Sequence, residues 1–487
     1  MPNAFAYFVL ALWPLVCLAM FRKLPVERAV IWSILGGYLL LPPLAEFDLP
    51  LVPDMDKYAI ANLSAFMIAV FYMGHRVSLW PTSWAARILV STFVLGAIPT
   101  VLTNSDPIIL QTFANSAPIV FKTGELPGLI WRDIFSVVSN QVIVLLPFFL
   151  GRHYLATDSG LRELLLALLI GGLAYSLPAL FEIRLSPQLN IWIYGFFQHS
   201  FLQMMRDGGF RPIVFLPHAL WLAFFFVMSL LAAAAFARHA AAQQRARLLF
   251  AVLYLGVVLL LCKSLASQLY AAALVPVVFL TGPRLQIALA VAIALVAVTY
   301  PMLRNLGVIP LDAILAQAEA ISPDRAQSLG YRFDNEQQLL DRAREKYLFG
   351  WGGWGRNLIR DLETGRILSI PDGRWIITFG TYGWFGYLSE MGLLATPLVL
   401  LGWRTRKLPA NARSPFAAPI ALILAVTLVD MLLNSTLIPF TWMIAGAILG
   451  YAETLGPRGR TDIPASIASD GPVIGRKTTP SGKRTVL

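Results

Sequence analysis

Residues 213–237 read IVFLPHALWLAFFFVMSLLAAAAFA, a run without a single Asp, Glu, Lys or Arg. About 20 apolar residues in an α-helix cross the hydrocarbon core of a bilayer, and this run is long enough to do so. The whole chain is 57% hydrophobic and only 13% charged, whereas a soluble globular protein is about one quarter charged. The sequence therefore predicts a membrane protein.

Apolar stretches of comparable length recur along the chain. They lie near 4–21, 29–45, 58–74, 88–103, 134–150, 164–181, 248–262, 265–280, 286–303, 384–402, 416–434 and 436–452. We therefore expect an all-α polytopic fold with about 12–14 transmembrane helices. Only Lys263-Ser264 separate two of the stretches, so a single long kinked helix over 248–280 is the alternative there.

The distribution of Lys and Arg predicts how the chain is oriented. When the spans alternate, the basic short loops fall on one side, which the positive-inside rule assigns to the cytoplasm. The N-terminus is then outside and the C-terminus cytoplasmic, in a bacterial inner (cytoplasmic) membrane. No basic region precedes the first apolar run, so we interpret it as a retained span and not as a signal peptide. The net charge of +11 lacks the clustered basic face of a nucleic-acid binder, and no nucleic-acid partner is expected.

Four regions follow from this pattern: a transmembrane bundle over 1–303, a periplasmic segment over 304–383, transmembrane helices over 384–455, and a disordered basic tail over 456–487. In the periplasmic segment two sets of apolar residues have helical spacing, which predicts two amphipathic helices. The sets are Leu311, Ile314, Leu315 and Ala318, and Leu339, Leu340, Ala343 and Tyr347. A tight, partly aromatic turn is expected at Gly350–Gly355.

Several cations lie where the predicted topology places the outer membrane surface. They are Arg211, Lys263, Arg304, Arg332 and Arg374. Guanidinium groups pair bidentately with phosphate oxygens, so these residues are candidates for holding a pyrophosphate. The alternative is that some of them only extend to lipid headgroups.

Asp372, Glu390 and His218 are the candidate catalytic groups, because a buried carboxylate or imidazole can take a proton from a sugar hydroxyl. Each has a structural alternative: Asp372 precedes Gly373 and suits a turn, Glu390 can pair with an Arg, and His218 can bond to a neighbouring helix. Asp430 is interpreted as structural.

Trp351, Trp354 and Trp375 are candidates for stacking on sugar rings, although Trp also belongs at membrane interfaces. The chain has no P-loop, no dinucleotide fingerprint and no HExxH zinc motif. Cys17 and Cys262 lie in separate apolar runs and support neither a disulfide nor a thiolate metal site. No cofactor and no metal ion are therefore expected.

The order of these features resembles the O-antigen ligase and O-antigen/exopolysaccharide polymerase superfamily. Arg211-Pro212 with Pro217-His218 is similar to the Arg-Pro stretch that opens a span in that family. Ser328–Arg332 (SLGYR) followed by Leu348–Gly352 (LFGWG) is similar to its late outer signature. Glu390–Leu394 (EMGLL) resembles its closing Glu-x-Gly-Leu element.

Two positions depart from the family pattern. Ser267 is followed by Gln268 where the family has an Arg, and Thr381 stands where ligases carry a periplasmic His. The resemblance implies a glycosyltransferase that joins polyprenyl-pyrophosphate-linked glycan repeats on the periplasmic face, in exopolysaccharide or lipopolysaccharide biosynthesis. In this comparison Arg211 and Arg332, with Lys263, would hold the pyrophosphate.

Three other functions stay open at this point. One is a structural or regulatory membrane scaffold, which would leave the charged residues at the outer surface without a purpose. A ligase would transfer the glycan to lipid A core or to protein. A transporter or flippase of glycolipid would show internal repeats and broken helices with polar sites at the membrane midplane. Beside the lipid-linked oligosaccharide and membrane lipids, a chain-length regulator is a candidate partner.

Overall fold

The computed structural model describes residues 1–48, 52–113, 120–206, 208–361, 364–409 and 413–456. Most of them are helical. The helices are α1 (Ala4–Lys23), α2 (Val26–Leu40), α3 (Lys57–Met67) with the π-helix η1 (Ile68–Tyr72), α4 (Trp84–Leu95), α5 (Ala97–Leu102), α6 (Trp131–Tyr154), α7 (Asp158–Leu185), α8 (Leu189–Tyr194), the 3-10 helix η2 (Phe201–Met204), α9 (Ala219–His239), α10 (Ala242–Leu261), α11 (Leu265–Leu280), α12 (Pro283–Asn305), α13 (Leu311–Ile321), α14 (Pro323–Arg344), α15 (Arg374–Thr405), α16 (Ala417–Leu433) and α17 (Pro439–Thr454).

Every apolar run that the sequence marks as a span coincides with a helix. Among the described residues, eight helices are long and apolar enough to cross a membrane: α1, the α4–α5 pair, α6, α7, α9, α10, α12 and α15. The other apolar helices, such as α11 and α16, are shorter. The structure therefore confirms the class of polytopic helical membrane protein. The predicted number of 12–14 spans is larger than the eight candidate spans found among the described residues.

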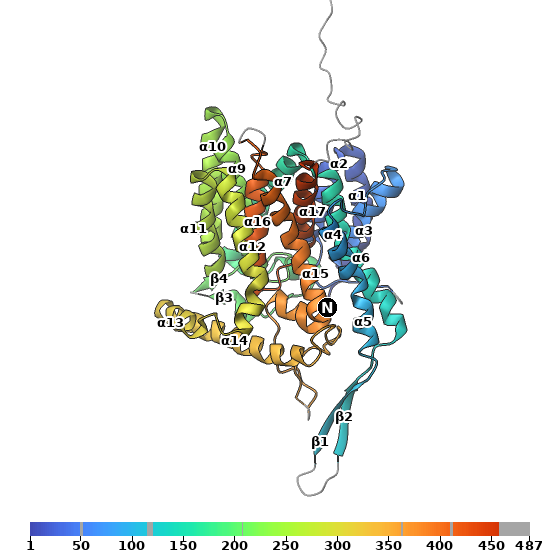
Figure 1. Cartoon of the computed structure of the whole chain (residues 1–487). Helices are drawn as coiled ribbons and strands as arrows, with labels where there is room; N and C mark the ends of the chain where they lie inside the picture. The colour runs from blue at the N-terminus through green and yellow to red at the C-terminus, as the bar shows by residue number, and fades with distance from the viewer. Residues whose placement is uncertain (49–51, 114–119, 207, 362–363, 410–412, 457–487) are drawn as a thin grey trace, which may run out of the picture.

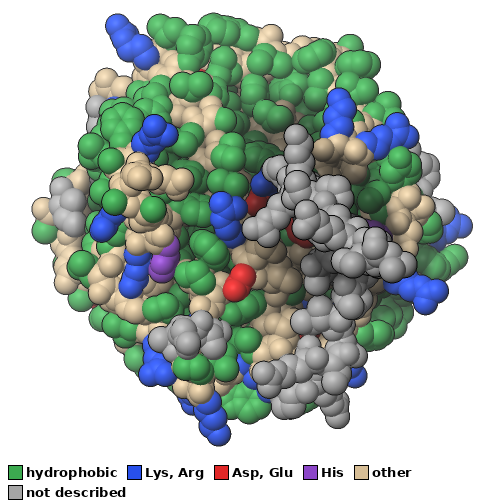
Figure 2. Space-filling model, turned by 90° about the horizontal axis from the view of Figure 1, so that it is seen from above, with side chains coloured by type: hydrophobic (Ala, Val, Ile, Leu, Met, Phe, Trp, Pro, Cys, Tyr) green, Lys and Arg blue, Asp and Glu red, His purple; other side chains and the backbone are tan. Residues whose placement is uncertain are grey.

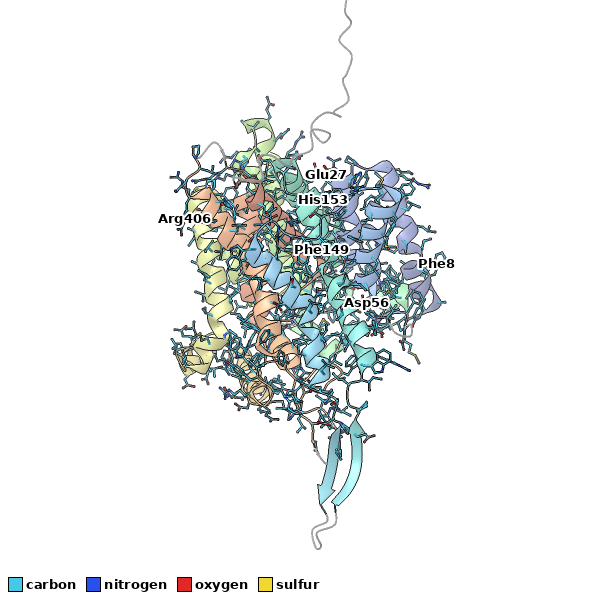
Figure 3. All side chains as sticks on the ribbon, turned by 45° about the vertical axis from the view of Figure 1, so that its right-hand side comes forward. Phe8, Glu27, Asp56, Phe149, His153 and Arg406 are labelled. Carbon is cyan, nitrogen blue, oxygen red and sulfur yellow. The ribbon has the colours of Figure 1, made fainter. Side chains whose placement is uncertain are left out.

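The long helices run side by side and form a bundle with two distinct ends (Figure 1). We call the end that carries α13 and α14 the domain end, and the end with the α9–α10 connection the loop end. The N-terminus belongs to the domain end, where the amide of Asn3 donates to the carbonyl of Tyr194 at 2.8 Å. Asp56 lies toward the domain end, and Glu27 and His153 lie toward the loop end (Figure 3).

The core of the bundle is built around α9, whose side chains are almost all buried. Helices α6 and α17 pack most closely, because glycines face the partner backbone. A Cβ atom added at Gly446 would lie 1.9 Å from the Phe148 carbonyl oxygen, and one at Gly151 would lie 2.2 Å from that of Met443. Small residues at such crossings are the usual way in which membrane helices gain packing contacts.

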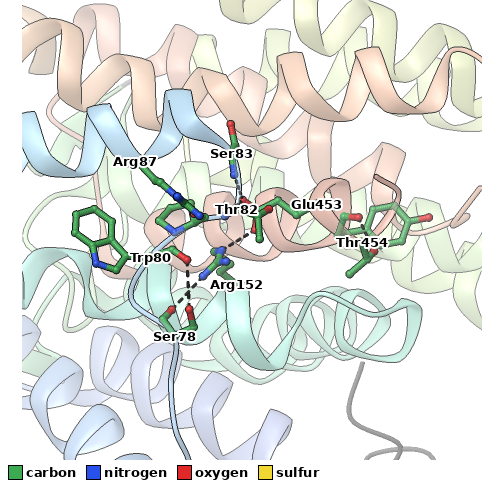
Figure 4. Close-up of polar contacts among 10 residues, drawn as sticks. Ser78, Trp80, Thr82, Ser83, Arg87, Arg152, Glu453 and Thr454 are labelled. Carbon is green, nitrogen blue, oxygen red and sulfur yellow. Dashed lines mark hydrogen bonds and ion pairs between the residues drawn. The ribbon is translucent and has the colours of Figure 1, made fainter. Parts of the chain in front are cut away.

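At the loop end, a buried ion pair connects α6, α17 and the chain before α4. Arg152 Nε lies 2.8 Å from Glu453 Oε2, and the amides of Thr82 and Ser83 donate to Glu453 Oε1 at 2.7 and 2.9 Å (Figure 4). Lys and Arg side chains are spread around this end, with few Asp or Glu among them (Figure 2). This is the charge pattern that the positive-inside rule associates with a cytoplasmic face.

Helix α15 is broken at Gly383, where φ is 64° and ψ is −159°. The Gly350–Gly355 turn fills the break. The amides of Trp351 and Gly352 donate to the carbonyls of Gly380 and Thr381, both at 2.9 Å, and the Trp384 amide donates to Tyr347 at 3.0 Å. A broken membrane helix needs such replacement partners for its freed backbone groups.

The break also depends on glycine. A Cβ atom at Gly383 would lie 2.4 Å from the backbone carbon of Leu348, and one at Gly350 would lie 2.4 Å from that of Thr381. Because both positions also have a positive φ, other residues would be strained there. The glycines of the predicted tight turn thus let two backbones approach.

Two short β-hairpins interrupt the helical pattern and were not expected. Strands β1 (Ile108–Phe113) and β2 (Val120–Leu126) pair antiparallel and project from the domain end (Figure 1), and β3 (Met205–Arg206) pairs with β4 (Gly209–Phe210). The pair α10 and α11 consists of two separate helices joined at Lys263, whose φ is 53°. The predicted disordered tail lies outside the described residues, apart from Gly456.

Candidate functional site

A cavity of about 890 Å³ opens at the domain end, between the bundle and helix α14. Its wall combines the chain around β3 and β4, the start of α9, helix α14, and the residues just before α15 and just after α16. It is lined by His199, Gln203, Met205, Arg206, Arg211, Pro217, His218, Leu220, Trp221, Ser322, Ser328, Tyr331, Arg332, Ile370, Pro371, Asp372, Asn434 and Ser435. Among these described residues three are Arg and one is a carboxylate, and we call it the cationic cavity.

Arg211 reaches this cavity from a loop that several buried groups hold in place. Glu182 of α7 accepts the amides of Ile213 and Val214 with one carboxylate oxygen, each at 2.8 Å. Lys57 of α3, itself 1% exposed, donates to the Phe215 carbonyl at 3.1 Å. Val214 has a positive φ of 53°, a conformation that persists only where the surroundings enforce it. The position of Arg211, which is 4% exposed, is therefore fixed by the bundle.

His218 ends the same loop and begins helix α9. Its Nδ1 accepts the amide of Leu220 at 3.0 Å as an N-cap, so Nδ1 carries no proton and the neutral ring is protonated on Nε2. Burial, with the charges of His199 and Arg211, lowers the pKa of His218 from 6.5 to about 3. The imidazole is thus a neutral hydrogen-bond donor near pH 7. It fits the role of an anion or hydroxyl donor better than the general-base role predicted from the sequence.

Arg332 and Asp372 meet across the cavity. Arg332 Nε lies 3.4 Å from Asp372 Oδ2, and both side chains are partly exposed. The Arg332 guanidinium also donates to the Leu433 carbonyl and to Asn434 Oδ1, each at 3.3 Å. Burial raises the pKa of Asp372 above its ordinary 3.8, and Arg332 opposes this shift.

Asp430 does not line the cavity, but it supports this arrangement through a hydrogen bond to Asn434. Its carboxylate accepts Asn434 Nδ2 at 3.0 Å and the Thr436 hydroxyl at 2.6 Å, and it is 3% exposed. Asp430 therefore orients Asn434, which in turn contacts Arg332. This agrees with the structural role expected for Asp430.

The other predicted cations have structural partners. Arg304 is 8% exposed and pairs with Glu336, so that it joins α12 to α14. Arg374 Nε donates to Glu390 Oε1 at 2.8 Å, across the break in α15. Lys263 Nζ donates to the Arg206 carbonyl at 2.7 Å and supports the β3–β4 hairpin.

These positions argue against two of the predicted roles. Glu390 has a side chain that is 2% exposed, and Thr378 also donates to it at 2.7 Å. A carboxylate enclosed in this way is not accessible to an acceptor hydroxyl, so the structure corrects the catalytic role of Glu390 to one of holding the broken helix together. Arg304 and Arg374 are likewise engaged away from the cationic cavity.

The three candidate Trp residues do not form one platform. Trp375 is fully buried against Tyr300, with ring centroids 5.6 Å apart, so its predicted stacking role is wrong. Trp351 has the Arg342 guanidinium 3.3 Å above its ring and donates Nε1 to the Arg342 carbonyl. Trp354 is 58% exposed and lines a different cavity.

Sequence reasoning missed Arg206, His199 and Gln203. The signal for Arg206 was the pair Gly208-Gly209, which favours a hairpin; in that hairpin Arg206 pairs with Gly209, and it lines the same cavity as Arg211. His199 lies with its ring centroid 4.4 Å from that of His218 and perpendicular to it. No sequence spacing indicates that contact.

Within the described ranges, no three His, Cys, Asp or Glu side chains come together in a way that suits a metal ion. The cationic cavity offers Arg, Asp, His and Asn side chains. This arrangement suits an anion with a neighbouring hydroxyl group.

Comparisons with known proteins do not place the chain in a family. No family model matches it, and no curated protein is significantly similar to it.

Proposed function

We propose that this protein is a membrane-embedded polymerase-like glycosyltransferase that joins polyprenyl-pyrophosphate-linked glycan repeat units. The observation that carries the proposal is the cationic cavity, where Arg206, Arg211 and Arg332 line one space with Asp372. The resemblance of the sequence to O-antigen and exopolysaccharide polymerases, which includes Arg211 and Arg332, also supports it.

The proposal includes an orientation. The domain end faces the periplasm of a bacterial inner membrane, the N-terminus is outside, and the shorter apolar helices complete about 12–14 crossings. The basic loop end supports this direction. A substrate that is anchored in the membrane by its lipid then presents its pyrophosphate at the depth of the cationic cavity.

The three Arg residues suit a pyrophosphate. Guanidinium groups remain charged at any physiological pH and can form two parallel hydrogen bonds with phosphate oxygens. Arg211 is buried and held by the loop before α9, so little side-chain entropy is lost when it binds an anion. The neutral His218 adds an Nε2–H donor beside it. These positive and donor groups would stabilise the charge that develops on a departing pyrophosphate.

Asp372 is the group placed to activate the acceptor. In the proposed step the acceptor hydroxyl oxygen attacks the anomeric carbon of the donor, and the bond from that carbon to the phosphate oxygen breaks. The hydroxyl proton moves to the Asp372 carboxylate, and polyprenyl pyrophosphate leaves with the electron pair. A phosphate that attracts Arg332 would draw it away from Asp372, which makes the carboxylate a stronger base.

The test is an Arg332→Ala variant in the native host, with Arg344→Ala as the matched control. Arg344 lies on the same helix but pairs with the exposed Asp341 at 2.7 Å. Membrane abundance is measured for both variants, and the surface polysaccharide is separated on a sizing gel. We expect Arg332→Ala to lose the high-molecular-weight polymer while single lipid-linked repeats persist, and Arg344→Ala to keep it.

Other results would point to other functions. Full-length polymer that stays on its lipid carrier would favour the ligase alternative, in which the glycan is transferred to lipid A core or protein. Accumulation of lipid-linked units on the cytoplasmic side would favour a flippase. Polysaccharide of normal length in Arg332→Ala at normal abundance would overturn the role of the cationic cavity.

A further inference from the structure

A second cavity of about 610 Å³ lies at the same end of the bundle. It is built by the α2–α3 loop, the first turns of α3 and α6, the Gly350–Gly355 turn and the break in α15. Its lining residues are Glu46, Asp48, Val52, Pro53, Asp54, Asp56, Tyr58, Ala59, Asn62, Arg132, Asp133, Ser136, Val137, Asn140, Ile143, Val144, Gly353, Trp354 and Tyr382. We call it the acidic cavity, because five of these are Asp or Glu and only one is Arg.

The carboxylates differ in what they already do. Asp56 and Asp133 cap helices: Asp56 accepts the amides of Tyr58 and Ala59, and Asp133 accepts that of Ile130. Glu46, Asp48 and Asp54 are exposed. Burial and the neighbouring charges of Asp54, Asp56 and Asp48 raise the pKa of Glu46. The cavity thus has a negative potential that repels a pyrophosphate.

Trp354 provides an aromatic surface on the wall that the Gly350–Gly355 turn contributes to this cavity. Its side chain is 58% exposed, and its φ of 56° is unusual for a residue with a bulky side chain. The neighbouring Gly353 and Gly355 let the turn present the indole to the cavity instead of burying it. Tyr382, at the break in α15, lies on the same wall.

Two polar groups on α3 also face this space. Tyr58 and Asn62 are one helical turn apart, so they lie on the same side of α3, and both line the cavity. The Tyr58 hydroxyl and Asn62 Oδ1 are buried without a hydrogen-bond partner among the described residues. Asn62 is 2% exposed. Buried polar atoms of this kind are rare in folded proteins unless a ligand or water satisfies them.

We propose that the acidic cavity binds an uncharged oligosaccharide segment. The carboxylates accept hydrogen bonds from sugar hydroxyls, and Trp354 stacks against the apolar face of a sugar ring. The identification of this sugar as part of the glycan substrate rests on the proposed function. The first half of α15, from Arg374 to Tyr382, spans roughly 12 Å and connects Asp372 of the cationic cavity with this second cavity. The acidic cavity would therefore hold sugar residues a short distance from the reacting end.

The experiment uses the purified full-length protein in nanodiscs. The probe is a short oligosaccharide cut from the host's surface polysaccharide, free of lipid and phosphate, and its affinity is measured by titration. Trp354→Gly suits the positive φ and removes the indole; Asp54→Asn removes one acceptor charge. The controls are Trp80→Ala, a Trp equally 58% exposed at the loop end, and Asp312→Asn on α13.

We expect Trp354→Gly and Asp54→Asn each to weaken oligosaccharide binding by roughly tenfold or more. The variant Trp354→Phe, which keeps an aromatic ring, should retain most of the wild-type affinity. The two controls and Arg332→Ala should bind as the wild type does. Wild-type protein that does not bind the probe, or Trp354→Gly that binds it normally, would overturn the proposal. A second result would also overturn it: tight binding of Ca²⁺ that is lost in Asp54→Asn and kept in Trp354→Gly, while both variants bind the oligosaccharide normally. The cavity would then be a cation site.

Failure of the two proposals can be told apart. Normal polysaccharide in the Arg332→Ala host contradicts the polymerase function, whereas the titration with Trp354→Gly depends only on the acidic cavity.

Discussion

The cationic cavity and the acidic cavity lie at the same end of one bundle and differ in charge and in construction. The first gathers Arg206, Arg211 and Arg332 around one carboxylate, and buried groups from several helices hold its loop. The second gathers five carboxylates around one Arg and exposes an aromatic ring. A lipid-linked sugar chain also has two unlike parts, an anionic pyrophosphate and an uncharged glycan. The comparison suggests that charge alone can orient such a molecule between the cavities.

The largest effect on activity is expected at the single carboxylate of the cationic cavity. Asp372→Asn keeps the shape but removes the base, and general-base catalysis contributes about 10²–10⁴-fold. Transfer of lipid-linked repeats by purified protein should therefore fall by at least about 100-fold. Oligosaccharide binding to the acidic cavity should be unchanged, and a parallel loss of both would show that the cavities are not separate.

The pH dependence of the same reaction tests the base more sharply. Burial raises the pKa of Asp372 above 3.8, and the base must be ionised, so the rate should fall as the pH is lowered through that raised pKa. His218, with a pKa of about 3, stays neutral throughout this range. An initial-rate profile over roughly pH 4 to pH 8, which brackets a raised carboxyl pKa, checks this. An unchanged rate at the acid end would exclude Asp372 as the base.

A change at the break in α15 should affect both cavities together. Gly383→Ala adds a Cβ atom 2.4 Å from the Leu348 backbone at a positive φ, which we expect to cost more than about 2 kcal/mol. Thermal unfolding in detergent measures the loss. Gly256→Ala is the matched control, because a Cβ atom at Gly256 meets nothing within 4 Å. Equal stability of the two variants would contradict the account of the break.

Substitutions of His218 can separate its role as the N-cap of α9 from its proposed role in anion binding. Asn is a good N-cap residue, so His218→Asn should keep the stability that His218→Ala loses, about 1 kcal/mol. Both variants lack the Nε2–H donor and should lose activity by roughly tenfold, the worth of one hydrogen bond to a charged group. Activity measured beside the melting temperature distinguishes the roles; full activity in His218→Asn would mean that the ring only caps α9.

The smallest effect concerns the acidic cavity. The pKa of Glu46 in the folded protein is raised above its ordinary 4.5, so the folded state binds the proton more tightly than the unfolded chain. The contribution of Glu46 to stability is therefore fully present at and below that ordinary value and is lost as the pH rises through the raised pKa. Melting temperatures of the wild type and Asp54→Asn check this: the decline should be smaller in the variant, and an equal decline would show that Asp54 does not act on Glu46.

Much of the helical fold was predictable, because hydrophobic runs and helix length are local properties of the sequence. Arg211, His218, Arg332 and Asp372 were also found, and the structure brings them to one cavity. Arg211 and His218 stand out at the start of an apolar run, and Arg332 and Asp372 as charged residues of the predicted periplasmic segment. The partners of the charges were not predictable. Glu336 neutralises Arg304 from another helix, and no local pattern reveals that contact.

The acidic cavity illustrates the same limit, namely that contacts between distant segments do not follow from local sequence patterns. Glu46, Asp48, Asp54 and Asp56 lie in a loop between two apolar runs, where acidic residues alone indicate no site, and Trp354 was one of three candidate Trp residues. Their meeting depends on how the α2–α3 loop and the Gly350–Gly355 turn fold toward each other, at a separation of about 300 residues that periodicity cannot bridge.

The backbone hydrogen bonds between the Gly350–Gly355 turn and the break in α15 have a consequence for how the protein assembles during synthesis. The turn precedes α15 in the chain, so it is synthesised before residues 374–405. The backbone groups freed at Gly383 find their partners only when that turn is on the same side of the bilayer as the first half of α15. The turn and the first half of α15 must therefore be on the same side of the membrane before α15 can adopt its final shape, which makes the folding of this helix a late step in assembly.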